Sequence, residues 1–165
     1  MARFTLTLSL AIFLTFTTSV FCQDITNVWQ CINLELTDDV LDSFPSDATS
    51  SVQNCALAFV KGSVTGDLKT FALPFSDEIR SSEFGIADLN NIPAALTNEF
   101  STLMASISNC TTRLISYSET NSNGVFKVNL NLQWQGRGYN RAEMARLDIV
   151  QTNAAWRIVN WDIDE

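Results

Sequence analysis

Apolar residues recur along this chain with two different periods, a helical one before residue 110 and a period of two after it. Between residues 25 and 44 they return every three or four positions, which predicts an amphipathic helix. Pro45 ends this pattern, and Asp47 offers a new N-cap for a second helical run that extends to Val64. We therefore expect the N-terminal part of the chain to be helical.

Two further helices are predicted before residue 110. Residues 68–75 have the spacing of a short helix. Residues 76–91 are polar and have no regular period, so an irregular segment is expected there. The spacing from 92 to 107 predicts another helix, with Asn91 as its N-cap and Pro93 in its first turn.

The clearest period of two lies in residues 125–135, where apolar residues alternate with Lys, Asn and Gln. Strands are also predicted over 111–118, 142–152 and 156–163, with short loops of turn-forming residues between them. The polar face of 125–135 indicates a sheet that is covered on one side only. Helices followed by a four-stranded or larger antiparallel sheet predict a single α+β domain.

The first 22 residues have the features of a secretory signal peptide. Met1–Cys22 contain one arginine and an uncharged apolar run, and cleavage is expected before Gln23. The alternative is an uncleaved anchor, but the apolar run is shorter than the ~20 residues that a spanning helix needs. We expect a secreted, extracellular chain without membrane attachment, in which 23–46 form an N-terminal helical extension and 47–165 form the domain.

Composition excludes several classes of function. The chain has 165 residues, of which 46% are hydrophobic and 17% charged, and 11 Phe and 4 Trp argue against disorder. Its net charge of -8 argues against nucleic-acid binding, which needs a basic surface. The absence of histidine removes Ser-His-Asp and Cys-His nucleophile systems and His-bearing zinc sites. No metal or other cofactor is expected.

The negative charge lies mainly in the N-terminal half. Residues 23–100 hold 12 acidic and 3 basic residues, whereas residues 101–165 hold 6 of each. Two interpretations remain open, a solvated helical surface and an acidic face for a basic partner.

Three cysteines remain after signal cleavage, namely Cys31, Cys55 and Cys110. In an oxidising compartment, three cysteines predict one disulfide and one remaining thiol. The spacing does not select among the three pairings. The N-x-[ST] sequon at Asn109, beside Cys110, predicts a glycosylation site.

Two stretches carry the pattern of a known family. Residues 51–71 (SVQNCALAFVKGSVTGDLKTF) contain a long amphipathic run, a Gly-Asp break and a short apolar segment. Residues 153–163 (NAAWRIVNWDI) contain a turn, a tryptophan and an alternating strand. Both resemble the nuclear transport factor 2-like superfamily, in particular small secreted members of the kind found in nematodes. The resemblance covers residues 47–165.

The resemblance implies a curved sheet wrapped around a helix, which gives a cone with a central cavity. Members of the superfamily use this cavity as an isomerase or dehydratase active site or as a ligand cup, or they serve as scaffolds. The outer face of the sheet often forms dimers. In this chain, the residues expected to line the cavity are apolar or aromatic: Phe59, Phe100, Tyr117, Trp134 and Trp156.

One charged constellation has catalytic potential. Arg146 and Asp148 share one face of a predicted strand, and Asn160 and Asp162 lie on the next strand. This set resembles the limonene epoxide hydrolase branch of the superfamily, in which an acid and a base activate water. However, Leu147 is expected to be the buried residue of its strand, which places its two neighbours outside as an exposed ion pair.

We therefore expect a secreted, non-enzymatic module that binds a small apolar ligand or a protein. A second copy of the chain is one such partner, through the outer sheet face. The polar residues of that face are Lys127, Asn129, Asn131, Gln133 and Gln135. The competing hypothesis is a secreted hydrolase or isomerase that uses Arg146, Asp148 and Asp162 inside the cavity.

Overall fold

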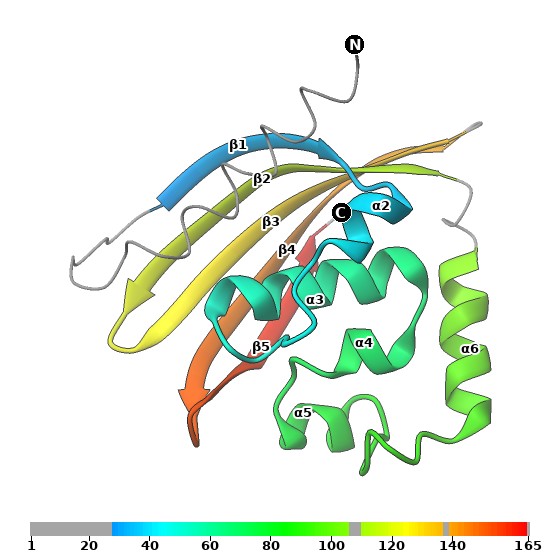
Figure 1. Ribbon diagram of the computed structural model, residues 1–165, viewed down its shortest axis with the longest axis vertical. Coiled ribbons are helices and arrows are strands. Elements are labelled where there is room, and N and C mark those ends of the chain that lie inside the picture. Colours follow the sequence, from blue (N-terminus) through cyan, green and yellow to red (C-terminus); the bar gives the residue numbers. More distant parts are fainter. Residues whose placement is uncertain (1–27, 106–109, 137–138, 165) are drawn as a thin grey trace.

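A computed structural model describes residues 28–105, 110–136 and 139–164. Within these residues the chain forms one antiparallel sheet with the strand order β1-β2-β3-β4-β5, and helices lie on one of its faces (Figure 1). The strands are β1 (Val28–Glu35), β2 (Thr111–Ser122), β3 (Val125–Gly136), β4 (Tyr139–Thr152) and β5 (Ala155–Asp164). The helices are α2 (Asp38–Asp42), α3 (Val52–Thr65), α4 (Leu68–Ala72), α5 (Asp77–Ser82) and α6 (Ala94–Ala105). The predicted α+β class is confirmed.

The four predicted strands are all present as β2 to β5. Each pairs antiparallel with the next, so that they form a meander. The β2–β3 turn uses Asn123 and Gly124, and the β4–β5 turn uses Asn153 and Ala154, all with positive φ. Such backbone angles match the twist of two-residue hairpin turns. The period of two was therefore a reliable guide to this part of the sheet.

The expectation of a helix across residues 25–44 is wrong for residues 28–35, which form β1 at the edge of the sheet. β1 pairs with β2, and its register shifts between Cys31 and Leu34, where Asn33 has φ 46°. This bulge interrupts the alternation of side chains, so the apolar positions mimic a helical period. Among the described residues of this range, only α2, near its end, is helical. The sheet consequently has five strands, and residues 28–35 belong to it.

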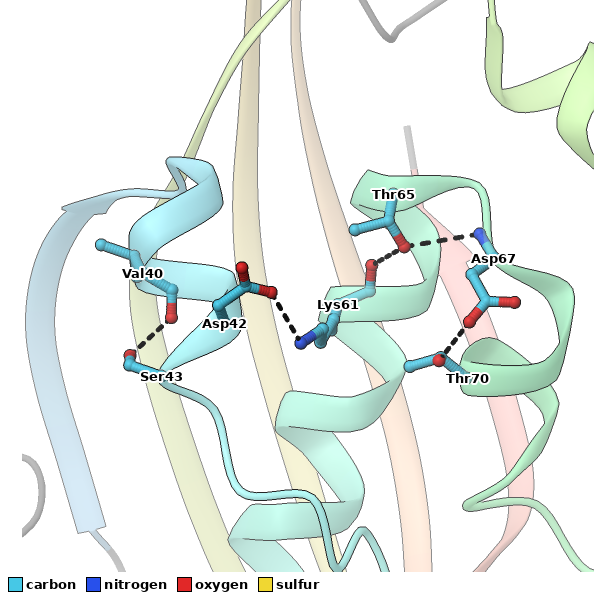
Figure 2. Close-up of polar contacts among 7 residues, drawn as sticks. All are labelled: Val40, Asp42, Ser43, Lys61, Thr65, Asp67 and Thr70. Carbon is cyan, nitrogen blue, oxygen red and sulfur yellow. Dashed lines mark hydrogen bonds and ion pairs between the residues drawn. The ribbon is translucent and has the colours of Figure 1, made fainter.

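The helices α3 and α4 form within the predicted segments, on either side of a break at Gly66 and Asp67, but α3 begins at Val52 with Ser51 and not Asp47 as its N-cap, and α4 ends at Ala72. Ser51 caps α3 by accepting a hydrogen bond from the Asn54 amide at 3.0 Å. Gly66 ends α3 in the left-handed conformation at φ 68°, which glycine adopts without steric cost. Asp67 then caps α4 through the Lys69 amide at 3.1 Å. An ion pair between Lys61 and Asp42, at 3.4 Å, connects α3 to α2 (Figure 2).

Two expectations for residues 76–107 need correction. The segment expected to be irregular contains α5, whose start is capped by Ser76 through the Ile79 amide at 3.3 Å. Sequence periodicity did not reveal α5, because this short helix begins with a polar turn and has no apolar stripe. α6 begins at Ala94, after Pro93, so Asn91 is not its N-cap; the Asn91 amide instead donates to the Asp88 carbonyl oxygen in a preceding turn.

The hydrophobic core lies between the helices and the inner face of the sheet, which is the face that the helices cover. It includes Phe59 from α3, Phe75 after α4, and alternate residues of β3 and β4 such as Leu130 and Leu147. The edge of β5 is partly covered as well, since its backbone hydrogen-bonds to Thr49, Pro74 and Ser76. Among the described residues, no helix is both long and apolar enough to cross a membrane.

Candidate functional site

The space between α3, α4 and β5 is filled by aromatic rings. Phe59 is 1% exposed, and its ring centroid lies 5.3 Å from that of Phe71 and 6.3 Å from that of Trp161. Phe100 of α6 packs on Phe71 at 5.0 Å. Phe75 and Phe84 complete the cluster. Two of the residues expected to line a cavity, Phe59 and Phe100, are therefore packed against other rings.

Tyr117 lies in the middle of the inner face and is 4% exposed. Its hydroxyl donates a hydrogen bond to Oε2 of Glu119 at 2.6 Å. Burial, together with the neighbouring Glu119 carboxylate, raises the pKa of Tyr117 well above its ordinary value of 10.0. The phenol therefore stays protonated at neutral pH, and the bond satisfies its buried polar group.

Trp134 lies at another position on the inner face and is 2% exposed. Its Nε1 donates to Oε2 of Glu143 at 3.1 Å, and Oε1 of the same carboxylate is 3.0 Å from Nε of Arg141. Trp156, near the other end of the sheet, packs edge-on against Phe126 with ring centroids 5.1 Å apart. Of the five expected cavity residues, Phe59 and Phe100 thus share one aromatic cluster, whereas the other three lie elsewhere, so the five do not gather around one site.

The sequence did not predict three carboxylates that accept hydrogen bonds from buried or partly buried aromatic side chains. Glu119 and Glu143 accept from Tyr117 and Trp134, as described above. Glu83, at the end of α5, accepts from Nε1 of Trp161 at 2.6 Å. Glu119 carried a usable signal, because it is two residues from Tyr117 on one strand and must share its face. The other two contacts depend on packing between elements and carry no local signal.

The outer face of the sheet, opposite the helices, carries the charged residues that the sequence singled out. Directly paired residues share a face, so the registers of β3, β4 and β5 define three rows of side chains. The rows are Lys127–Asp148–Asn160, Asn129–Arg146–Asp162 and Asn131–Met144–Asp164.

The structure brings Arg146, Asp148 and Asp162 onto this outer face. Arg146 Nη1 is 3.4 Å from Oδ2 of Asp162, and its Nη2 also pairs with Asp164. Asp148 accepts from Asn160 Nδ2 at 3.3 Å and lies 3.9 Å from Lys127 Nζ. The side chains of Arg146 and Asp162 are 50% and 62% exposed.

Leu147 is 1% exposed, so its strand is buried on the side that the alternation predicted. The charged set consequently lies on the outer face, opposite the packed interior, and its side chains are partly exposed to solvent. Such exposed ion pairs contribute little to stability, on the order of 0.5 kcal/mol each. This arrangement gives no enclosed polar site in which an acid and a base would face each other across a substrate.

The outer face also contains a large exposed apolar side chain, Met144, in the third row. Met144 is 37% exposed. Its cross-strand neighbours are Asn131 and Asp164, and Arg146 is two residues along the same strand. Asn129 on the next row donates to the hydroxyl of Ser118 at 3.1 Å, which fixes its amide. The face is therefore an ordered polar surface around a flexible apolar side chain.

Some of the residues in the cysteine and glycosylation predictions lie outside the described part of the chain. Cys55 and Cys110 are both free thiols and are not bonded to each other. Each of the three predicted pairings includes Cys55 or Cys110, so the structure forms none of them. Asn109 lies outside the described residues, and its glycan remains a prediction. Within the described part of the chain, no three His, Cys, Asp or Glu side chains are grouped as a metal site would require.

Comparison of the chain with models of protein families, with curated proteins and with solved structures gave no significant match. The resemblance to the nuclear transport factor 2-like superfamily therefore remains a prediction from the sequence pattern.

Proposed function

We propose that this protein is a secreted, non-enzymatic binding module of nuclear transport factor 2-like type, and that it uses the outer face of its sheet to bind protein. The features of Met1–Cys22 support secretion. The observation that carries the binding role is the outer face itself, with its paired charges, fixed amides and exposed Met144.

A second copy of the chain is the partner that this face fits. The chain has a net charge of -8, so two molecules repel each other over most of their surfaces. The three rows of the outer face hold two basic and three acidic side chains, which nearly cancel. A twofold interface brings the same patch of each molecule together, and a patch with both signs of charge is complementary to itself.

The neutral side chains of the rows also suit an interface. Asn129, Asn131 and Asn160 can form hydrogen bonds across it without the cost of desolvating a charge. Met144 has an unbranched, polarisable side chain that adapts to a partner surface. A few side chains that become fully buried in a contact carry most of its binding energy, and Met144 is the large exposed apolar side chain of these rows.

The test is the molar mass of the secreted protein by size-exclusion chromatography with light scattering. We expect the mass of two chains for the unmodified protein and of one chain for Met144→Glu, because a carboxylate would be buried within the contact, two residues from Arg146 and opposite Asp164. Leu103→Glu is the matched control: Leu103 is also apolar, is 64% exposed and lies on α6. It should leave the mass unchanged. A single-chain mass for the unmodified protein would exclude the second copy as partner.

Mass spectrometry of the same secreted material tests whether the chain is secreted with its signal peptide removed. We expect a chain that begins at Gln23, and the measurement also reports the state of Cys31 and the occupancy of Asn109. An intact Met1 in secreted protein would contradict signal cleavage.

A further inference from the structure

Arg157, near the start of β5, is a partly buried cation without a counter-ion. Its Nη1 is buried and has no hydrogen-bond partner within the described part of the chain. Its cross-strand neighbour is Val150, which offers no acceptor side chain. A buried donor without a partner costs free energy, and the cost is larger for a charged group. We propose that Arg157 binds a carboxylate group, with Arg80 as a second cation beside it.

Other arginines of the sheet have an acidic residue close to them. Arg113 lies opposite Glu35 in the register of β1 and β2, and Arg141 Nε is 3.0 Å from Oε1 of Glu143. Arg157 differs from them, although the chain has 18 acidic residues. The missing counter-charge at Arg157 is therefore a local feature of the start of β5, where an anion from outside would supply it.

Arg80 of α5 brings a second guanidinium to this edge of the sheet. Ile158, next to Arg157, forms a parallel bridge with Phe75. The carbonyl oxygen of Phe75 accepts a hydrogen bond from Nη1 of Arg80 at 2.6 Å. The Arg80 side chain is only 12% exposed, so this bond holds it against the protein. The backbone thus fixes Arg80 to the segment that borders the strand of Arg157.

The electrostatics agree with this placement. Burial lowers the pKa of Arg80 below its ordinary value, the neighbouring Asp77 carboxylate opposes this shift, and the charge of Arg157 lowers the pKa further. The two guanidinium groups are therefore close enough to repel each other. An anion between them would remove that repulsion and also supply the acceptor that Arg157 lacks.

The charges around the pair favour a single negative charge on the ligand. Asp77 forms an ion pair with Arg80, so the two arginines and this carboxylate together carry one positive charge. Asp47 also acts on this region, but it is exposed and its Oδ1 accepts from the amide and the hydroxyl of Thr49, at 3.1 and 3.3 Å. A carboxylate neutralises the remaining charge, whereas a phosphate dianion would leave an excess of negative charge.

Shape favours a carboxylate as well. A guanidinium is planar and presents parallel N–H donors, which match the two oxygens of a carboxylate better than a spherical chloride. Either a free organic acid or the C-terminal end of a peptide carries this group. Carboxylate binding at Arg157 does not require two copies of the chain to associate.

Nitrogen-15 labelling of the arginine side chains gives a direct test. We would record the Nε–H signals of the secreted protein while sodium acetate replaces sodium chloride at constant ionic strength. The Arg157 signal, identified by its absence from Arg157→Lys, should shift in a saturable way with a dissociation constant in the millimolar range. The Arg80 signal should follow it with the same midpoint, and the signal of Arg141, which is paired with Glu143, should stay in place. Neutral acetamide should shift none of them.

Two further probes define the ligand. N-acetylglycine has the carboxylate of a peptide end. If it binds at least about fivefold more tightly than acetate, the site recognises a chain end, and equal binding indicates a free acid. Sodium phosphate above pH 7 should bind more weakly than acetate. Tighter binding of phosphate would overturn the assignment to a carboxylate.

A matched pair of variants locates the binding, with the Arg80 signal as the readout. Arg157→Lys keeps the positive charge but loses the planar donor pair, and should weaken acetate binding at least about tenfold. Arg141→Gln removes an arginine that already has a carboxylate partner, and should leave binding within about twofold. An Arg157 signal in the unmodified protein that does not respond to acetate, or unchanged binding by Arg157→Lys, would overturn the proposal.

Discussion

Cys55 shows how burial controls the chemistry of a single residue. Its thiol lies on the buried side of α3 and donates to the Trp156 carbonyl oxygen at 3.2 Å. Burial raises the pKa of Cys55 from 9.0 to about 12, so the thiol is neutral and unreactive in the folded protein at physiological pH. This residue belongs to the core and is unsuited to nucleophilic chemistry.

The raised pKa of Cys55 predicts a dependence of stability on pH. The unfolded thiol ionises near its ordinary pKa of 9.0 and the folded thiol only near 12, so the free energy of unfolding falls as pH rises through this window. Cys55→Ala removes this contribution and should flatten the decline. Denaturant unfolding of both proteins at about pH 8 and about pH 10.5 measures it. Equal slopes in the two proteins would show that Cys55 does not carry the effect.

The hydrogen bond between Glu143 and Trp134 leads to a second prediction at the residue scale, on the free energy of unfolding. It accepts the Nε1–H of Trp134, which is 2% exposed. Glu143→Ala leaves this donor buried without its acceptor and should lower the free energy of unfolding by about 1–3 kcal/mol. Glu143→Gln keeps an oxygen acceptor and should recover much of that loss. Chemical denaturation with tryptophan fluorescence measures both, and an equal loss in the two variants would contradict this role for the hydrogen bond.

The contact between α3 and α4 depends on one glycine. A Cβ on Gly62 would lie 2.2 Å from the backbone nitrogen of Phe71, a distance at which the two helices must separate. In an exposed helix, Gly→Ala stabilises by about 1 kcal/mol, but here the steric clash outweighs that gain. Gly62→Ala should therefore destabilise the protein by about 3 kcal/mol or prevent folding.

Gly124→Ala is the control for this substitution. Gly124 has φ 82° in the β2–β3 turn and nothing lies within 4 Å of where its Cβ would be, so only backbone strain of about 1–2 kcal/mol is expected. Thermal unfolding of both variants compares the two costs. If Gly62→Ala proved no more destabilising than Gly124→Ala, the close packing of α3 on α4 would be wrong.

At the scale of elements, sequence periodicity predicted the helices and strands whose own residues alternate regularly between buried and exposed positions. The strands β3 and β4 each bury alternate residues on one side, so their period of two was visible, and α3 carries a continuous buried stripe. β1 was missed because its bulge at Asn33 breaks the alternation and because its partner β2 lies far along the chain. α5 was missed because it buries no residue and so leaves no stripe.

At the scale of the whole molecule, the two faces of the sheet have different roles. The inner face is packed with apolar and aromatic side chains, whereas the outer face carries rows of amides and paired charges. The sequence predicted this division, since Leu147 and its neighbours alternate between the two faces. It did not predict how the interior is filled, because the rings of Phe59 and Phe71 pack against Trp161 of β5, which is distant in the sequence.

The distribution of charge relates the two faces of the sheet to the association of two copies of the chain. The excess of acidic residues lies in residues 23–100, which include α2 to α5 and most of α6, while the rows on β3 to β5 hold both signs of charge. Repulsion between two copies is therefore weakest where their sheets face each other. Because little repulsion remains there for salt to screen, association through the outer face should depend only modestly on ionic strength.

The most direct test of this account is a dilution series of the secreted protein with carbon-13-labelled methionine methyl groups. If two copies meet through their outer faces, the Met144 signal shifts with protein concentration, while the signal of Met104, which lies on α6, stays constant. A Met144 signal that does not change from micromolar to millimolar protein, or a concentration-dependent shift at Met104 alone, would contradict the proposed binding face.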